Sequence, residues 1–252
     1  MGTVSKALSL LDILAGPEAR LGLTEIARAS GFDKATTRRL LVELKANGHV
    51  EQDDTSRDYM LGPSLLRLGR LREARFPFAR IADPVVRALA EATGETAHAS
   101  EYGGGVLASV AVQASDKSNR VIVNLGERLP LHATASGLAV LAASPPAVLA
   151  AILAKALTRF SDQTETDPDR ITALVDAART RGYSLSDQLK ERGVHSVAAA
   201  ILSPKGVPVG AVAVAMPSAR ATPDTLTHAG GLVRDAAAEI AARLFGGRKG
   251  RT

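Results

Sequence analysis

The sequence predicts an α+β protein with a small N-terminal unit and a larger C-terminal one. In the N-terminal part, short amphipathic helices separated by a glycine turn precede two short alternating segments, which is typical of a winged helix-turn-helix. In the remainder, strand pairs joined by tight turns alternate with helices, which favours an antiparallel sheet flanked by helices. A length of 252 residues accommodates one large or two modest domains.

The N-terminal unit is predicted to contain three helices. Apolar residues recur at helical spacing over Val4–Leu14, and Gly16-Pro17 ends this first helix. A second short helix has Ile26 on its apolar face. Gly31 then supplies the backbone freedom of a tight helix-to-helix turn. Asp33 is a good N-cap for the third helix.

The third helix, expected from about Lys34 to Asn47, has two contrasting sides. At roughly 100° per residue, the side expected to pack on the preceding helices carries Thr37, Leu40, Leu41 and Leu44. The opposite side carries Ala35, Arg39, Val42 and Ala46. Small groups allow close approach to a DNA groove, an Arg near the helix N-terminus can bind a guanine edge, and flanking cations can bind phosphates. This outer side is therefore predicted to read DNA.

A hairpin with a polar tip is predicted over His49–Leu61, entered through Asn47-Gly48. Arg57 near its tip is the natural cation to lie along a phosphate backbone. With the third helix, this makes the candidate DNA-binding residues Lys34, Ala35, Thr36, Arg38, Arg39, Lys45 and Arg57. The alternative is a set of ordinary amphipathic helices with solvated charges.

The net charge of +5 is unevenly distributed. Residues 1–62 carry eight Lys and Arg against nine Asp and Glu, whereas residues 63–80 carry five Arg against one Glu. DNA affinity must therefore come from local placement of cations. The absence of Cys excludes disulfides and cysteine-built zinc sites. No apolar run approaches the ~20 residues of a membrane span, and the N-terminus is not a signal peptide, so we expect a cytoplasmic protein without a membrane partner.

The predicted domain boundaries place a DNA-binding unit at 1–62, a linker helix at 63–80, an effector-binding or oligomerisation domain at 81–246 and a flexible basic tail at 247–252. Gly62-Pro63 starts the linker helix, because Pro suits a first helical turn, and Phe76-Pro77 closes it. This helix is expected to connect the domains and to contribute to a dimer interface. The alternative is a surface helix of one continuous domain.

The C-terminal unit is predicted to alternate between strands and helices. The expected helices cover Ile81–Thr93, Thr134–Ala143, Pro146–Leu157, Pro168–Arg181 and Pro223–Phe245. The expected strands cover Thr96–Tyr102, Val106–Gln113, Val121–Asn124, Val194–Leu202 and Val207–Met216. Gly103-Gly104-Gly105 is interpreted as a hairpin turn rather than a phosphate cradle, since no Gly-Lys-Ser/Thr follows.

No catalytic residue, cofactor or metal site is predicted. A Ser-His-Asp set could be assembled on paper from His132, Ser136, Asp187 and His195. However, no Gly-x-Ser-x-Gly elbow presents the serine, and a triad is recognised by geometry. The five His are widely separated and match no zinc spacing.

The whole chain resembles the isocitrate-lyase-regulator (IclR) family of bacterial transcription factors. The N-terminal resemblance lies in LTEIARASGFDKATTRRLLVELKANGHVEQD and YMLGPSLLRLG, and the C-terminal one in RLPLHATASGLAVLA, RGYSLSDQ, GVHSVAAAI and AVAVAMP. These motifs follow the family's order over nearly the whole chain. The resemblance implies a winged helix-turn-helix joined by a linker helix to a GAF-like effector-binding domain. It also implies binding to palindromic operators as dimers or dimers of dimers.

The resemblance further implies an effector pocket between the loop and helix start at Leu131–Gly137 and the strands matching Ser184–Ser186, Val194–Ala199 and Val212–Ala215. Free amides at a helix N-terminus attract a carboxylate, so this helix start is expected to hold an anionic group. The predicted ligand-binding residues are Ala135, Ser136, Gly137, Ser186, Asp187, Ser196, Ala213 and Ala215.

The chain departs from the family's keto-acid pattern at several of these positions. Leu138 stands where the family often has Lys, and alanines stand at 213 and 215 where keto-acid binders have polar groups. The expected pocket is roomier and less polar than one built for glyoxylate or pyruvate, so a larger acid such as an aromatic carboxylate is predicted. The expected function is a transcriptional regulator, more a repressor than an activator. The alternative is a DNA-binding protein whose C-terminal domain only oligomerises.

Overall fold

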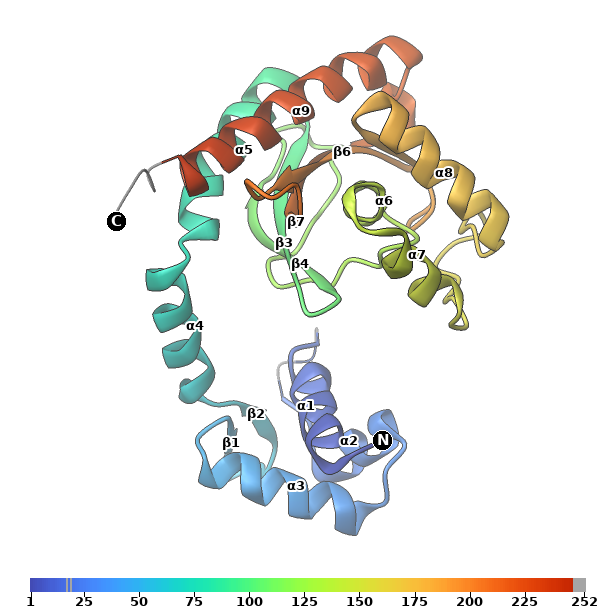
Figure 1. Ribbon diagram of the computed structural model, residues 1–252. Helices are drawn as coiled ribbons and strands as arrows, with labels where there is room; N and C mark the ends of the chain where they lie inside the picture. Colours follow the sequence, from blue (N-terminus) through green and yellow to red (C-terminus); the bar gives the residue numbers. More distant parts are fainter. Residues whose placement is uncertain (17, 19, 247–252) are drawn as a thin grey trace. The chain divides into compact units, whose positions relative to one another are not determined.

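The computed structural model describes residues 1–16, 18 and 20–246, and the chain forms two compact units (Figure 1). The first comprises Met1–Phe76 and the second begins at Pro77. The finer division predicted at 62, 80 and 246 stays a prediction. Pro17, expected to help end the first helix, and the expected basic tail over 247–252 lie outside the described residues.

The first unit combines packed helices with a short hairpin. Its helices are α1 (Thr3–Leu14), α2 (Leu23–Ser30), α3 (Lys34–Ala46) and α4 (Pro63–Arg75). The strands β1 (Val50–Gln52) and β2 (Tyr59–Leu61) pair antiparallel, with Glu51 opposite Met60. Leu21 forms an isolated bridge with Tyr59, which ties the α1–α2 connection to the hairpin.

The core of the first unit is formed by one side of each of the three N-terminal helices. Its almost fully buried members include Leu10, Leu14, Ile26, Leu40, Leu41 and Val50. Thr37 is also fully buried, which confirms the predicted packing side of α3. In α1 the buried side is centred on Leu10, so Val4 and Leu8 of the predicted apolar stripe remain exposed.

The second unit contains a five-stranded antiparallel sheet with helices on both faces. Its helices are α5 (Phe78–Thr93), α6 (Ala135–Ala143), α7 (Pro146–Leu153), α8 (Pro168–Arg181), the short 3-10 helix η1 (Ser218–Arg220) and α9 (Pro223–Phe245). Its strands are β3 (Thr96–Gly103), β4 (Val106–Gln113), β5 (Ser184–Asp187), β6 (Val194–Leu202) and β7 (Pro208–Pro217). They lie in the order β4-β3-β7-β6-β5, so the predicted α+β fold class is confirmed.

The sheet is covered on both faces, which explains the apolar character of its central strand. α5 and α9 pack on one face, while α6 packs on the other with α8 beside it (Figure 1). β7 is therefore buried along nearly its whole length. At Gly210 of β7 a Cβ atom would lie 2.3 Å from the Ser100 carbonyl oxygen and 2.7 Å from the Phe78 ring, so only Gly allows this approach.

The predicted strand over Val121–Asn124 was wrong. The Val121 carbonyl accepts a hydrogen bond from Thr96 Oγ1 at 2.7 Å, and the Asn124 carbonyl accepts one from Ser109 Oγ at 2.7 Å. These carbonyls bond to side chains, whereas a strand requires a row of backbone partners. The apolar run therefore forms an extended segment without strand pairing.

Two helix boundaries also differ from those predicted. The helix expected over Pro146–Leu157 ends at Leu153, and Leu157 packs separately against the core of the second unit. The helix expected from Ile81 already begins at Phe78, directly after Pro77, and Phe78 is fully buried. Within the described residues, no helix combines the length and apolar content needed to cross a membrane.

Candidate functional site

The outer side of α3 is a basic, exposed surface. Lys34, Arg38, Arg39 and Lys45 are exposed, as are the small residues Ala35 and Ala46, and Val42 is 52% exposed. None of the described carboxylates forms an ion pair with these four cations. Basic side chains therefore project from a surface whose central positions are small or apolar, which is a geometry that fits a nucleic-acid groove.

The N-terminus of α3 is held by its cap. Asp33 accepts hydrogen bonds from the Thr36 amide at 2.7 Å and from the Thr36 hydroxyl at 2.8 Å. The hydrogen bond from the Thr36 amide is the main reason why the pKa of the Asp33 carboxyl is lowered. Thr36, a predicted DNA contact, is thus engaged within the cap and half-buried.

Arg57 lies at the end of the hairpin tip and is exposed. Its φ of 64° places a non-glycine residue in the left-handed region. Gln52 Nε2 donates to the Arg57 carbonyl at 2.8 Å, and Asp53 Oδ1 accepts from the amides of Thr55 and Ser56. Local hydrogen bonds therefore order the tip. None of these bonds uses the Arg57 side chain, which is exposed to solvent.

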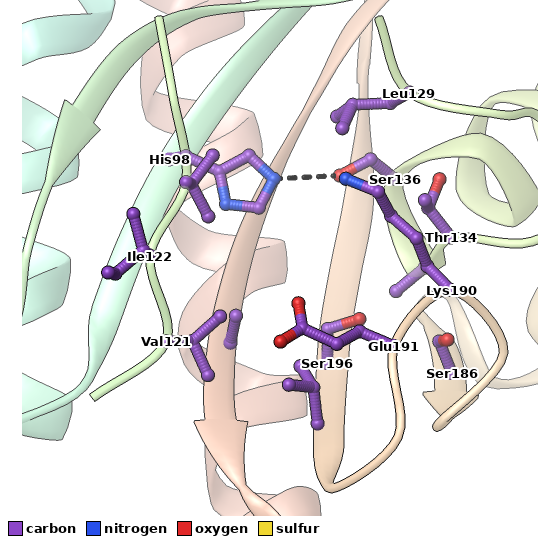
Figure 2. Close-up of a pocket in the computed structure, with 14 residues that line it drawn as sticks. His98, Val121, Ile122, Leu129, Thr134, Ser136, Ser186, Lys190, Glu191 and Ser196 are labelled. Atoms are coloured by element: carbon purple, nitrogen blue, oxygen red, sulfur yellow. Dashed lines mark hydrogen bonds between the residues drawn. The ribbon is translucent and has the colours of Figure 1, made fainter. Parts of the chain in front are cut away.

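The second unit contains a cavity of about 60 Å³ beside the start of α6, which opens to solvent. It collects five of the predicted ligand-binding residues, which are Ala135, Ser136, Ser186, Ser196 and Ala215. The other lining residues are His98, Val121, Ile122, Val123, Leu129, Thr134, Lys190, Glu191 and Val194. Seven of the fourteen lining residues are aliphatic, and the other seven are polar or charged, including the loop residues Lys190 and Glu191 (Figure 2).

Gly137, Asp187 and Ala213 do not line this cavity. The Gly137 amide donates to Thr134 Oγ1 at 3.0 Å, so it is occupied by the helix cap. Asp187 is exposed and pairs with His195. Ala213 is fully buried in an alanine cluster between the sheet and α6. The ligand-contacting role predicted for these three residues stays untested, and their placement argues for structural roles.

The start of α6 provides free hydrogen-bond donors at the cavity. Thr134 is the N-cap, and its side chain and carbonyl accept from the Gly137 and Leu138 amides. Within the part of the chain that the structure describes, the amides of Ala135 and Ser136 have no acceptor. Such amides, at the positive end of a helix dipole, form a site for an anion.

His98 forms a neutral, buried part of the cavity wall. Burial is the main reason why its pKa is lowered to about 4, with the Lys190 cation adding to the effect and Glu127 opposing it. Its Nε2 faces Ser136 Oγ at 3.4 Å (Figure 2). Among the described residues, His98 Nδ1 has no hydrogen-bond partner. The imidazole is therefore uncharged at pH 7.

Lys190 supplies a cation at the same cavity. It forms an ion pair with Glu127, which lies between β4 and α6 in the sequence. Neither His98 nor Lys190 was predicted from the sequence as a site residue. His98 is buried among other buried residues of a strand, and Lys190 lies in an irregular loop, so neither had a motif that would have marked it.

The serine, histidine and aspartate side chains considered for catalysis are not assembled into one set. His132 contacts the Thr158 carbonyl through Nε2, while Ser136 faces His98. His195 does bind Asp187 Oδ1 at 2.8 Å, but its other ring nitrogen faces Ser218 at the surface. Among the described residues, no group of three or more His, Cys, Asp and Glu side chains could hold a metal ion.

Comparison with known proteins identifies both units. The IclR helix-turn-helix domain model matches residues 3–54, and the bacterial transcriptional regulator IclR C-terminal model matches residues 74–242. The chain is 36% identical over 217 residues to the glycerol operon regulatory protein of Streptomyces coelicolor, covering 84% of this chain and 83% of that protein.

Solved structures agree with this match. An IclR transcriptional regulator from Silicibacter sp. TM1040 superposes with a TM-score of 0.87 at 42% identity, covering 96% of each chain. An IclR homolog from Microbacterium hydrocarbonoxydans, complexed with 4-hydroxybenzoate, has a TM-score of 0.77 at 22% identity and covers 96% of this chain and 99% of that one. The matched families and relatives are regulators and not enzymes, as predicted. The chain belongs to the IclR family of bacterial transcriptional regulators.

Proposed function

We propose that this regulator is a repressor that binds a palindromic operator as a homodimer or dimer of dimers and is controlled by a small organic acid. The single observation that carries the proposal is the second unit's cavity, whose lining combines aliphatic side chains with polar groups and the free amides at the start of α6. A winged helix-turn-helix bound in the groove of an operator can block transcription by its presence there. Repression therefore requires only the DNA-binding unit and the ligand cavity described above. Half-site spacing is set by the dimer, so a ligand that biases the placement of the heads changes operator affinity.

The DNA contacts follow from the exposed side of α3. Arg39 lies on its central line and is proposed to reach a base edge, whereas Lys34, at the first helical position, is proposed to bind a phosphate. Arg38, Lys45 and Arg57 supply further phosphate contacts. Ala35 and the half-buried Thr36 allow the helix start to approach the duplex closely.

Arg39→Ala and Lys34→Ala are expected to have different effects. Arg39→Ala should cost about 1–3 kcal/mol and relax specificity at one base position, because a base contact is lost. Lys34→Ala should weaken binding to all duplexes alike and flatten the salt dependence, because fewer counterions are released. The measurement is a salt titration of binding to a selected operator and to random duplex. Equal losses on both duplexes for Arg39→Ala would remove it from the base-reading role.

A carboxylate fits the cavity at the α6 end. The free amides of Ala135 and Ser136 can donate to it, and Lys190 can contribute a positive charge. The aliphatic wall then favours an apolar body attached to the acid, because apolar surface is removed from water on binding. These features support an acid larger than glyoxylate or pyruvate, such as an aromatic carboxylate. The 4-hydroxybenzoate bound by the Microbacterium homolog is a compound of this class.

Isothermal calorimetry on the full chain tests the effector class. We expect benzoate to bind and glyoxylate to bind at least tenfold more weakly, a difference of about 1.4 kcal/mol. Benzoate should also change the affinity for a selected operator, which a C-terminal domain that only oligomerises would not show. Tight binding of a two- or three-carbon acid, with none for benzoate, would contradict the proposed effector class.

The dimer is supported by apolar side chains that a monomer leaves in water. No residue of α4 is buried, and Leu66, Leu68 and Leu71 are 58%, 45% and 49% exposed. Apolar side chains gathered on one helix are typical of an association surface. We therefore propose that α4 both connects the two units and contributes to the dimer interface.

A further inference from the structure

One wall of the cavity lacks regular secondary structure. The segment 119–123 contributes Val121, Ile122 and Val123 to the lining and has neither helix nor strand. Ile122 is 72% exposed, so the segment separates the cavity from solvent. A wall without ladder hydrogen bonds must be held by other contacts.

The main contact comes from a residue distant in the sequence. Arg220 at the end of η1 donates from Nη2 to the Asn119 carbonyl at 2.8 Å. The same guanidinium donates from Nε to Glu95 Oε1 at 2.5 Å and from Nη2 to Glu95 Oε2 at 2.7 Å. Arg220 does not itself line the cavity. Its direct link to the cavity wall is the hydrogen bond to the Asn119 carbonyl.

The orientation of Arg220 is set by a buried carboxylate. The Glu95 side chain is only 5% exposed and also binds Lys117 Nζ at 2.9 Å. A planar guanidinium held on both oxygens of a carboxylate has little freedom to rotate. Its remaining donor capacity is thereby directed at the Asn119 carbonyl.

A second attachment fixes the middle of the segment. Thr96 Oγ1, at the start of β3, donates to the Val121 carbonyl at 2.7 Å and accepts from the Ser115 amide at 3.2 Å. Glu95 and Thr96 are adjacent, so both attachments start from one point of the fold. The cavity wall is thus attached, directly through Thr96 and indirectly through Glu95 and Arg220, to the junction between α5 and β3.

We propose that Arg220 is a positioning residue for the ligand cavity: by clamping the Asn119 carbonyl it holds the 119–123 segment as a wall and slows the escape of bound acid. The proposal rests on the proposed effector site for its functional consequence, but not for the mobility of the wall. Loss of the clamp frees one end of the segment, while the cavity residues on β3, α6 and β6 stay in place.

The absence of natural Cys allows a direct test of mobility. A nitroxide label on Ile122→Cys reports the wall, and one on Val207→Cys, 52% exposed in the β6–β7 turn, reports an unrelated site. Arg220→Lys keeps a positive charge for Glu95, but its single ammonium cannot reproduce the planar fork. Arg87→Lys is the matched control, since Arg87 forms an exposed ion pair with Asp83.

In Arg220→Lys, the label at position 122 is expected to become more mobile while the label at 207 is unchanged. In the unlabelled protein, benzoate should dissociate about tenfold faster, and Arg87→Lys should change neither quantity. Arg220→Gln, which removes the charge as well, provides a second disruption of the same clamp. Circular dichroism establishes that each variant is folded.

Unchanged mobility at position 122 in both Arg220 variants would overturn the proposal. An equal rise at both labelled positions would also overturn it, because it would indicate a general loosening of the unit. Faster dissociation without a change at position 122 would assign Arg220 a different role and likewise overturn it. If benzoate does not bind the unmodified protein, the proposed effector class fails, while the label experiment still decides whether Arg220 holds the wall.

Discussion

Glu95→Gln is expected to lower the free energy of unfolding by about 3 kcal/mol, the lower end of the range for breaking a buried ion pair. The carboxylate is 5% exposed and bridges Arg220 and Lys117. Removing its charge leaves two cations together without a counter-charge. The loss stays at the lower end because Arg220 is 29% and Lys117 46% exposed, so water partly screens them. Urea denaturation followed by circular dichroism at pH 7 measures the difference.

The same variant should lose a specific pH dependence. Burial by itself would raise the pKa of the Glu95 carboxyl, but hydrogen bonds and charges from Arg220 and Lys117 outweigh it and lower the pKa below its ordinary value. Because the folded pKa is lowered, the stabilisation is complete above the unfolded value of about 4.3 and is lost as pH falls through the folded value. The difference between the two proteins should therefore shrink below about pH 4.3.

Exposed Glu91, one helical turn before Glu95, provides the matched control. Glu91→Gln should stay within about 0.5 kcal/mol of the unmodified protein, as most surface substitutions do. A Glu95→Gln loss no larger than that of Glu91→Gln would show that the buried cluster contributes nothing to stability. A difference that persists unchanged at low pH would assign it to packing rather than charge.

Gly137→Ala is expected to destabilise the second unit by about 3 kcal/mol, at the upper end for overpacking. A Cβ at this position would lie 2.4 Å from Leu131 Cα, 2.5 Å from the Leu131 oxygen and 2.6 Å from the Pro130 oxygen. These atoms belong to the backbone, so no side chain can rotate away. The start of α6 must shift instead, and its amides lose their places in the cavity. Thermal and urea denaturation should show the loss, and calorimetry should show weaker benzoate binding.

Gly231→Ala in α9 is the matched control, because nothing lies within 4 Å of its added Cβ. Ala is favoured over Gly inside a helix, so this variant should be as stable as the unmodified protein or more stable by about 0.5–1 kcal/mol. If both Gly→Ala substitutions had the same effect, close approach of α6 to Leu131 would not explain the need for Gly137.

Local patterns predicted the helices of both units, and the boundaries were predicted best where a start or stop signal is present. Asp33 caps α3 through Thr36, as expected, and the 3.6-residue period placed Thr37 and Leu40 on the buried side. The starts of α4, α8 and α9 follow from Pro in the first turn. The exposed basic side of α3 was predictable for the same reason. Once the helical period places one side of α3 in the core, the opposite side must face solvent.

The ligand cavity was only partly predictable, because its residues come from elements far apart in the chain. Family resemblance led to Ser136, Ser186 and Ser196, which do line it. His98 and Lys190 were missed because a buried strand histidine and a loop lysine have no periodic signal. Gly137 was expected to bind ligand, yet its amide is used by Thr134 and its missing Cβ allows close packing on Leu131.

The sequence by itself determined the fold class, most of the helices and strands, the basic outer side of the third helix and the family. These properties depend on residues close together in the chain, where periodicity and capping act. Only the tertiary structure decided that 121–123 forms a cavity wall and not part of a strand, and that Glu95 and Arg220, 125 residues apart, form a partly buried ion pair beside it. Such contacts depend on which surfaces the packed sheet and helices bring together, and no local pattern encodes that outcome.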